Sequence, residues 1–113
     1  MSKVIREGRW VFFNICDEQG KAVLHCRDLY AVNFCKFDNG VYTLSDEDLG
    51  ILLASSDKKA LKREVQSEII AQYRKYIARK ESCLPSRREK EIRRTLDSRF
   101  CCWESEPDGG SRP

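Results

Sequence analysis

The hydrophobic period of the chain changes once, close to residue 57. Before this point, apolar residues form short runs rich in branched and aromatic side chains. After it, they recur every three or four positions. The first pattern is typical of β-strands and the second of amphipathic α-helices. One such change in a short chain predicts an α+β fold, in which a sheet precedes a helical unit.

The charge of the chain divides at the same boundary. Residues 1–57 carry six Lys and Arg against nine Asp and Glu, a net charge of −3. Residues 58–99 carry fourteen against six, a net charge of +8. We therefore expect one domain over residues 1–103, made of an acidic sheet part, 1–57, and a basic helical part, 58–103. Residues 104–113 lack apolar side chains and are expected to form a disordered tail.

Three apolar runs predict the first strands of an antiparallel meander of about four strands. They cover residues 10–16, 21–26 and 29–37, and polar residues separate them. Asn39-Gly40 then favours a type I′ hairpin turn, because both residues tolerate the positive φ that this turn requires. A two-residue loop at this point would pair Lys36 with Thr43.

A short helix and two longer amphipathic helices are expected to follow, the longer two packed on one face of the sheet. Ser45 and the three carboxylates after it resemble the N-cap and first turn of the short helix. The first long helix covers residues 58–80, with a wide apolar stripe that consists of Leu61, Val65, Ile69, Ile70, Tyr73, Tyr76 and Ile77. Ser86 and Glu89 fit a capping box for the second. Its narrower stripe consists of Ile92, Leu96, Phe100 and Trp103.

The sequence contains no pattern typical of a catalytic, cofactor or metal site. His25-Cys26 is the only pair of adjacent His and Cys residues, and no Cys-x-x-Cys spacing occurs. Neighbours on a strand point to opposite faces, so a regular strand cannot direct both of these side chains to one metal ion. We therefore expect neither an enzyme nor a bound cofactor. The six cysteines are expected to be reduced thiols, because the N-terminus has no apolar run of signal-peptide length.

The candidate binding residues are cations of the helical part, with two tyrosines beside them as possible aromatic contacts. The cations are Arg74, Lys75, Arg79, Lys80, Arg87, Lys90 and Arg94, and the tyrosines are Tyr73 and Tyr76. Such residues can contact phosphates and stack on bases. However, the four cations at 74–80 point in different directions on a helix. Carboxylates at i,i+4 spacing also partly neutralise the second long helix. Both observations favour a protein partner over a nucleic acid.

The sequence therefore predicts a small cytosolic protein-binding module, an adaptor or inhibitor that docks on an acidic surface of a larger protein or complex. Small accessory proteins of phages and plasmids that block a host complex have this character. The alternative is a nucleic-acid-binding protein that uses the basic helical half. No apolar run is long enough to span a membrane. The apolar stripe of residues 58–80 also exceeds what a four-stranded sheet needs, so a homodimer is a further option.

Overall fold

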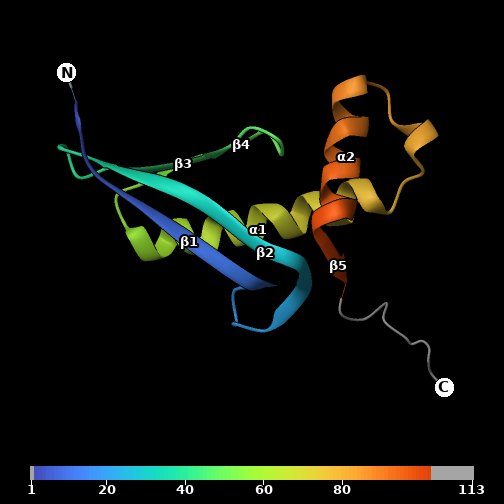
Figure 1. Cartoon of the computed structure of the whole chain (residues 1–113), viewed down its shortest axis with the longest axis horizontal. Helices are drawn as coiled ribbons and strands as arrows, with labels where there is room; N and C mark the ends of the chain where they lie inside the picture. The colour runs from blue at the N-terminus through green and yellow to red at the C-terminus, as the bar shows by residue number, and fades with distance from the viewer. Residues whose placement is uncertain (1, 103–113) are drawn as a thin grey trace.

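The computed structural model describes residues 2–102 and has the predicted α+β class (Figure 1). The strands are β1 Val4–Cys16, β2 Ala22–Phe37, β3 Tyr42–Asp46, β4 Ile51–Ser55 and β5 Phe100–Cys102. The helices are α1 Lys58–Ile77 and α2 Arg87–Arg99, with a single 3₁₀ turn, Glu81–Cys83, between them. Trp103 and the predicted tail, 104–113, lie outside the described residues.

The sheet is antiparallel, with the order β1-β2-β3-β4, and β5 also pairs with β2. The predicted break at residues 27–28 is wrong, because β2 runs through these positions as one long strand. The ladder is nevertheless irregular there. β1 advances by two residues, from Phe12 to Asn14, while β2 moves back by five, from Tyr30 to His25. The extra residues bend β2 within the sheet, so a local break signal corresponds to a bulge and not to a strand end.

The predicted type I′ turn at Asn39-Gly40 is also wrong, although a hairpin does form there. Only Gly40 has a positive φ, of 87°. The Phe37 N–H donates to the Val41 oxygen (2.8 Å) and the Gly40 N–H to the Phe37 oxygen (3.0 Å). These bonds define a three-residue loop that ends in a glycine bulge. The longer loop moves the register by one position, so Lys36 pairs with Tyr42 and not with Thr43.

The short helix predicted from Ser45 does not form, and the hairpin β3–β4 replaces it. The capping signal itself is present, but Asp46 provides it: its Oδ1 accepts from the backbone N–H groups of Asp48 (3.1 Å) and Leu49 (3.3 Å). Gly50 then adopts a left-handed backbone conformation, with a φ of 66°, and the turn ends there without continuing as a helix. Residues after Gly50 return along β3, so Ile51 and Leu49 reach the core from a hairpin.

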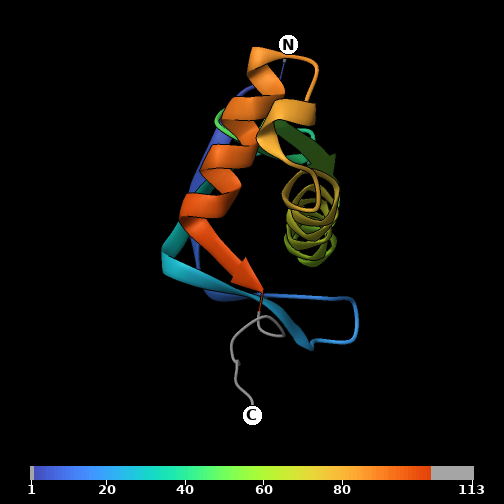
Figure 2. The same ribbon diagram turned by 90° about the vertical axis from the view of Figure 1, so that its right-hand side faces the viewer.

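α1 begins where the sequence predicts, with Asp57 as N-cap accepting from the Lys59 N–H at 3.0 Å. Leu61, Val65 and Ile69 are completely buried, and no large apolar side chain of α1 is exposed among the described residues. The helix covers one face of the sheet and contacts β4, β1 and β3 (Figures 1 and 2). The wide apolar stripe is therefore covered within one chain, and it gives no support to a homodimer.

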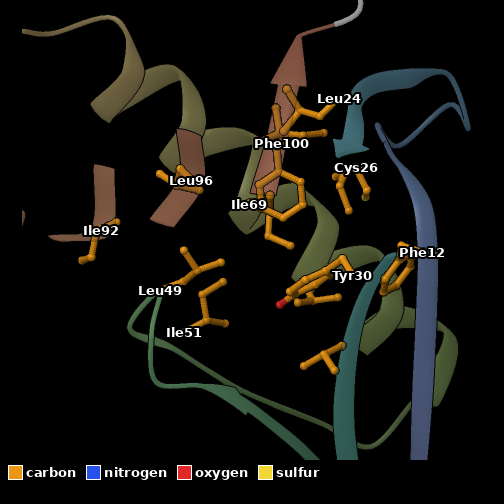
Figure 3. Packing of buried hydrophobic residues seen from close by; sticks show 14 of the residues in the cluster. Phe12, Leu24, Cys26, Tyr30, Leu49, Ile51, Ile69, Ile92, Leu96 and Phe100 are labelled. Atoms are coloured by element: carbon orange, nitrogen blue, oxygen red, sulfur yellow. The ribbon is translucent and has the colours of Figure 1, made fainter. Parts of the chain in front are cut away.

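α2 begins at the predicted cap, where the Ser86 hydroxyl accepts from the Glu89 N–H at 3.1 Å. The helix ends at Arg99, so the expected helical position of Phe100 is wrong: Phe100 opens β5 and pairs with Cys26 of β2. Figure 2 shows α2 leading directly into this strand. Phe100 is completely buried, with its ring 5.4 Å from that of Tyr30 in an edge-on contact. These two rings lie beside Ile69 of α1 in the centre of the core (Figure 3).

Candidate docking surface at the basic end

The predicted cations gather where α1 ends, the chain turns, and α2 begins. Residues 74–94 contain nine Lys and Arg and three Asp and Glu, a net charge of +6. Of the seven predicted binding residues, Lys90 is half-buried and the other six, Arg74, Lys75, Arg79, Lys80, Arg87 and Arg94, are exposed. In Figure 1 this region forms one end of the elongated molecule, which measures 55 × 32 × 21 Å. We call it the basic end, residues 74–94.

The basic end is held by the core and by hydrogen bonds to the backbone. Leu84, in the connection between the helices, is buried, as are Ile92 and Leu96 of α2. The Arg93 Nε donates to the carbonyl oxygen of Arg79 at 2.7 Å, which joins α2 to the end of α1. A carbonyl near a helix C-terminus has no partner within its own helix, so this guanidinium supplies one. The exposed cations consequently project from a fixed support.

Not every cation at this end is available to a partner. Arg94 forms a bidentate ion pair with Glu81, in which the Arg94 Nη2 donates to the Glu81 Oε1 at 3.1 Å. The hydrogen bonds from Arg94 lower the pKa of the Glu81 carboxyl below its usual range. Arg88 donates to the carbonyl oxygen of Glu47 and so ties α2 to the β3–β4 turn. The side chains of Arg74, Lys80 and Arg87 make no hydrogen bond or ion pair with the residues that the structure describes.

The two tyrosines proposed as aromatic contacts pack with or against the core. Tyr76 is buried in the core, and the ammonium of Lys75 lies 5.0 Å from its ring centre. Tyr73 is half-buried and packs against the core, and burial raises the pKa of its hydroxyl. Tyr76 therefore offers no open ring face to a nucleic-acid base, and Tyr73 exposes only part of its side chain. The structure thus brings the seven cations to one end of the molecule, whereas one of the two tyrosines is buried and the other is half-buried.

The sequence interpretation missed an apolar surface on the face of the sheet opposite α1. Residues on β1, β2 and β4 alternate between buried and exposed, and the exposed set includes large apolar side chains. Phe13 is 69% exposed and Leu52 is 79% exposed, and Val11 and Leu29 are exposed as well. A signal was available, because these residues occupy the positions that alternate with the core set. Apolar side chains on both faces of a strand are typical of a sheet that meets something on each face.

The residues considered as metal ligands or nucleophiles, His25 and Cys26, lie on β2. Among residues 2–102, no three His, Cys, Asp or Glu side chains come together in a way that could hold a metal ion. The His25 Nδ1 lies 3.3 Å from the Asn14 Oδ1, on the neighbouring strand. Cys26 is buried, and burial raises the pKa of its thiol to about 11, which is unsuited to a thiolate nucleophile. Within the same residues, neither helix is long and apolar enough to cross a membrane.

Comparisons of the chain with protein-family models, with curated proteins and with solved structures each found no match.

Proposed function

We propose that this protein is a non-enzymatic, cytosolic protein-binding module, an adaptor or inhibitor whose basic end docks on an acidic surface of a larger protein or complex. The observation that carries the proposal is the net charge of +6 over residues 74–94, where seven of the nine Lys and Arg side chains are exposed. Arrays of this kind steer an oppositely charged partner and set its orientation. Contacts between cations and carboxylates at the rim of an interface mainly raise the rate of association.

The intramolecular contacts of the cations favour a protein partner over a nucleic acid. Arg88, Arg93 and Arg94 are already engaged within the molecule. With Tyr76 buried and Tyr73 half-buried against the core, the basic end has no fully exposed aromatic ring among the described residues. A nucleic-acid interface draws on both phosphate contacts and stacking when it binds single strands. A surface of mixed cations and occasional carboxylates is better suited to a protein rim.

The test is capture of a partner from native cytosol by the tagged protein and by a charge-reversed variant. The variant carries Arg74→Glu, Lys80→Glu and Arg87→Glu, because none of these side chains has a hydrogen bond or ion pair to lose with the described residues. Arg94 is retained, since a glutamate there would repel Glu81. A control variant carries Lys21→Glu, Lys59→Glu and Arg63→Glu, which make the same change of charge at exposed positions elsewhere.

We expect a partner that survives nuclease treatment, is lost by the first variant and is retained by the control. Its affinity should fall weakly with salt. A duplex-binding protein that neutralised four phosphates would instead show a log–log salt slope of about −3.6. The proposal fails if nuclease removes every partner, or if both variants lose the partner equally. Tight binding of a random oligonucleotide by the pure protein would replace it with the nucleic-acid alternative.

A further inference from the structure

One edge of β2 has a gap between its two partner strands. β1 pairs along the other edge, while β3 pairs with Phe34–Lys36 and β5 pairs with Leu24–Cys26. Residues 27–33 of β2 therefore have no strand partner on this edge within the described part of the chain. An unpaired strand edge carries rows of N–H and C=O groups that can accept a further strand.

The gap opens into a groove of about 810 Å³. Its lining comes from β2, β3, the β3–β4 turn and the end of α2, and includes the exposed side chains of Leu29 and Leu52. The Arg99 guanidinium lies at one end, bonded to Asp46 (3.1 Å) and Asp48 (2.7 Å). A groove of this volume has room for several residues of an extended peptide.

The register indicates which backbone groups face the groove. The Phe37 N–H donates to Val41 of the β3 side, so the backbone polar groups of Phe37 point toward that edge. The backbone N–H and C=O groups of successive residues point to alternate edges of a strand. Ala31 and Phe37 are separated by an even number of positions, so the N–H and C=O groups of Ala31 point to the same edge. Ala31 lies in the middle of the gap and lines the groove. An added strand would meet these backbone groups and place alternate side chains between Leu29 and Leu52.

The charge of the groove selects the partner. Four carboxylates line it, those of Asp28, Asp46, Glu47 and Asp48, against the single cation Arg99, a net charge of −3. Arg99 is already shared between two of them, while the side chains of Asp28 and Glu47 form no hydrogen bond or ion pair with the described residues. An incoming segment that carries Lys or Arg would compensate these two carboxylates.

We propose that this groove binds an extended, basic segment of a partner protein, which adds to β2 as a strand. Backbone hydrogen bonds to the Ala31 region supply affinity. The acidic rim and the apolar side chains supply preference for a segment of alternating cationic and apolar residues. This site is separate from the basic end. It binds a basic segment, whereas the basic end binds an acidic surface. The chain would thereby engage two different segments, as an adaptor does.

The test uses a fluorescent, end-blocked peptide made of three Lys-Val repeats, measured by anisotropy at physiological ionic strength. Two peptides serve as comparisons: a Glu-Val version, and the Lys-Val peptide with N-methyl groups on alternate residues, which keeps the charge but removes strand hydrogen bonds. The groove variant is Asp28→Lys with Glu47→Lys. The control variant is Glu64→Lys with Glu68→Lys, which makes the same change of charge on the exposed side of α1.

We expect the Lys-Val peptide to bind the wild-type protein and the control variant, and to bind the groove variant about tenfold more weakly. The acidic and N-methylated peptides should not bind. In amide NMR spectra, the peptide should shift Ala31 and its neighbours. Variant Arg74→Glu, Lys80→Glu, Arg87→Glu should bind the peptide as the wild type does, which separates this proposal from that for the basic end.

Three outcomes would overturn the proposal. Equal binding of the N-methylated peptide would mean that charge alone attracts it. Shifts confined to β1 would place the added strand on the outer edge of the sheet. Equal weakening in the groove and control variants would show that net charge, and not this groove, determines binding.

Discussion

The fold uses the carboxylates of the sheet half and the cations of the helical half in different ways. Asp17 accepts two backbone N–H groups in the first hairpin, and Asp57 accepts one at the start of α1. At the basic end, in contrast, side chains such as Arg74 and Arg87 extend into solvent. Short carboxylates reach nearby backbone groups, whereas long cationic side chains keep their charge in water. The net charge of a segment therefore does not by itself identify the surface that a partner can reach.

Asp46 is the clearest case of a charge engaged by the fold. Its side chain is 10% exposed, accepts from the Tyr30 hydroxyl at 2.7 Å, and pairs with Arg99. It also caps the β3–β4 turn. Glu81 at the basic end has a cation partner as well, but both side chains of that pair lie in solvent. The same kind of ion pair should consequently differ greatly in its contribution to stability between the two regions.

The largest expected effect is that of Asp46→Ala. Removal of this carboxylate leaves the Tyr30 hydroxyl without its acceptor, the Arg99 guanidinium with Asp48 as its remaining partner, and the turn without its cap. We expect the free energy of unfolding, measured by urea titration, to fall by about 3 kcal/mol. Asp48→Ala is the control, because its side chain is 68% exposed and should contribute no more than about 0.5 kcal/mol. Equal losses in both variants would mean that the buried and the exposed carboxylate contribute alike to stability.

The next largest effect on stability should come from a glycine of the sheet half whose backbone conformation other residues rarely adopt. Gly40 has a φ of 87°, and a Cβ built there would meet no atom within 4 Å. Gly40→Val therefore tests conformation without a steric clash, and should lower the free energy of unfolding by roughly 2 kcal/mol. Gly40→Asn should lose less, since asparagine adopts positive φ more readily. If valine and asparagine proved equivalent, the loop would not depend on the conformation of residue 40.

The helices were the most predictable part of the molecule. α1 and α2 combine a long 3.6-residue period with caps, at Asp57 and Ser86, that act within one turn of the chain. Local physics suffices for such segments. The Asn39-Gly40 hairpin was predictable in position but not in type, because Asn39 keeps a negative φ and the loop gains one residue. That single residue changes the register of every pair in β2–β3.

The predictions that were wrong concern segments whose structure depends on contacts with distant parts of the chain. Ser45 and its three carboxylates suit a helix start and an Asx turn equally well, and the return of Ile51 along β3 selects the turn. Phe100 fits the helical stripe of α2, but pairing with Cys26 draws it into a strand. The same pairing helps to create the gap along β2. The cations of the basic end could be identified from composition, whereas the groove depends on the ends of β3 and β5.

Alkaline pH should distinguish the buried network from the exposed charges. Burial, with the hydrogen bond to Asp46 as a further cause, raises the pKa of Tyr30 above its ordinary value of 10. Burial raises the pKa of Cys26 from 9 to about 11. The unfolded chain releases both protons first, so their contribution to stability is complete below pH 9 and is lost as pH rises. Each group that ionises only in the unfolded chain should lower stability by up to about 1.4 kcal/mol per pH unit.

Tyr30→Phe tests this contribution directly. At neutral pH the variant should be less stable than the wild type, because Asp46 loses a donor. Above pH 10 its stability should decline less steeply, since phenylalanine has no proton to release. The measurement is urea unfolding at a series of pH values. Parallel curves for the two proteins above pH 10 would show that Tyr30 does not remain protonated in the folded state.

The smallest effect is expected from Glu81→Gln at the basic end. The pKa of Glu81 is lowered by its hydrogen bonds to Arg94, so the pair stabilises the fold above the unfolded-state pKa of about 4.5 and loses this contribution as pH falls through the lower, folded-state value. Both side chains are solvated, so water and salt screen the attraction and ordering of two long side chains opposes it. The variant should therefore match the wild type closely in urea titrations at neutral pH. The slight difference that remains should vanish on acidification and in high salt. A loss as large as that of Asp46→Ala would mean that the turn between α1 and α2 depends on this pair and not on the burial of Leu84 and Ile92. The exposed cations would then be part of the fold, and the basic end would be less free to serve a partner.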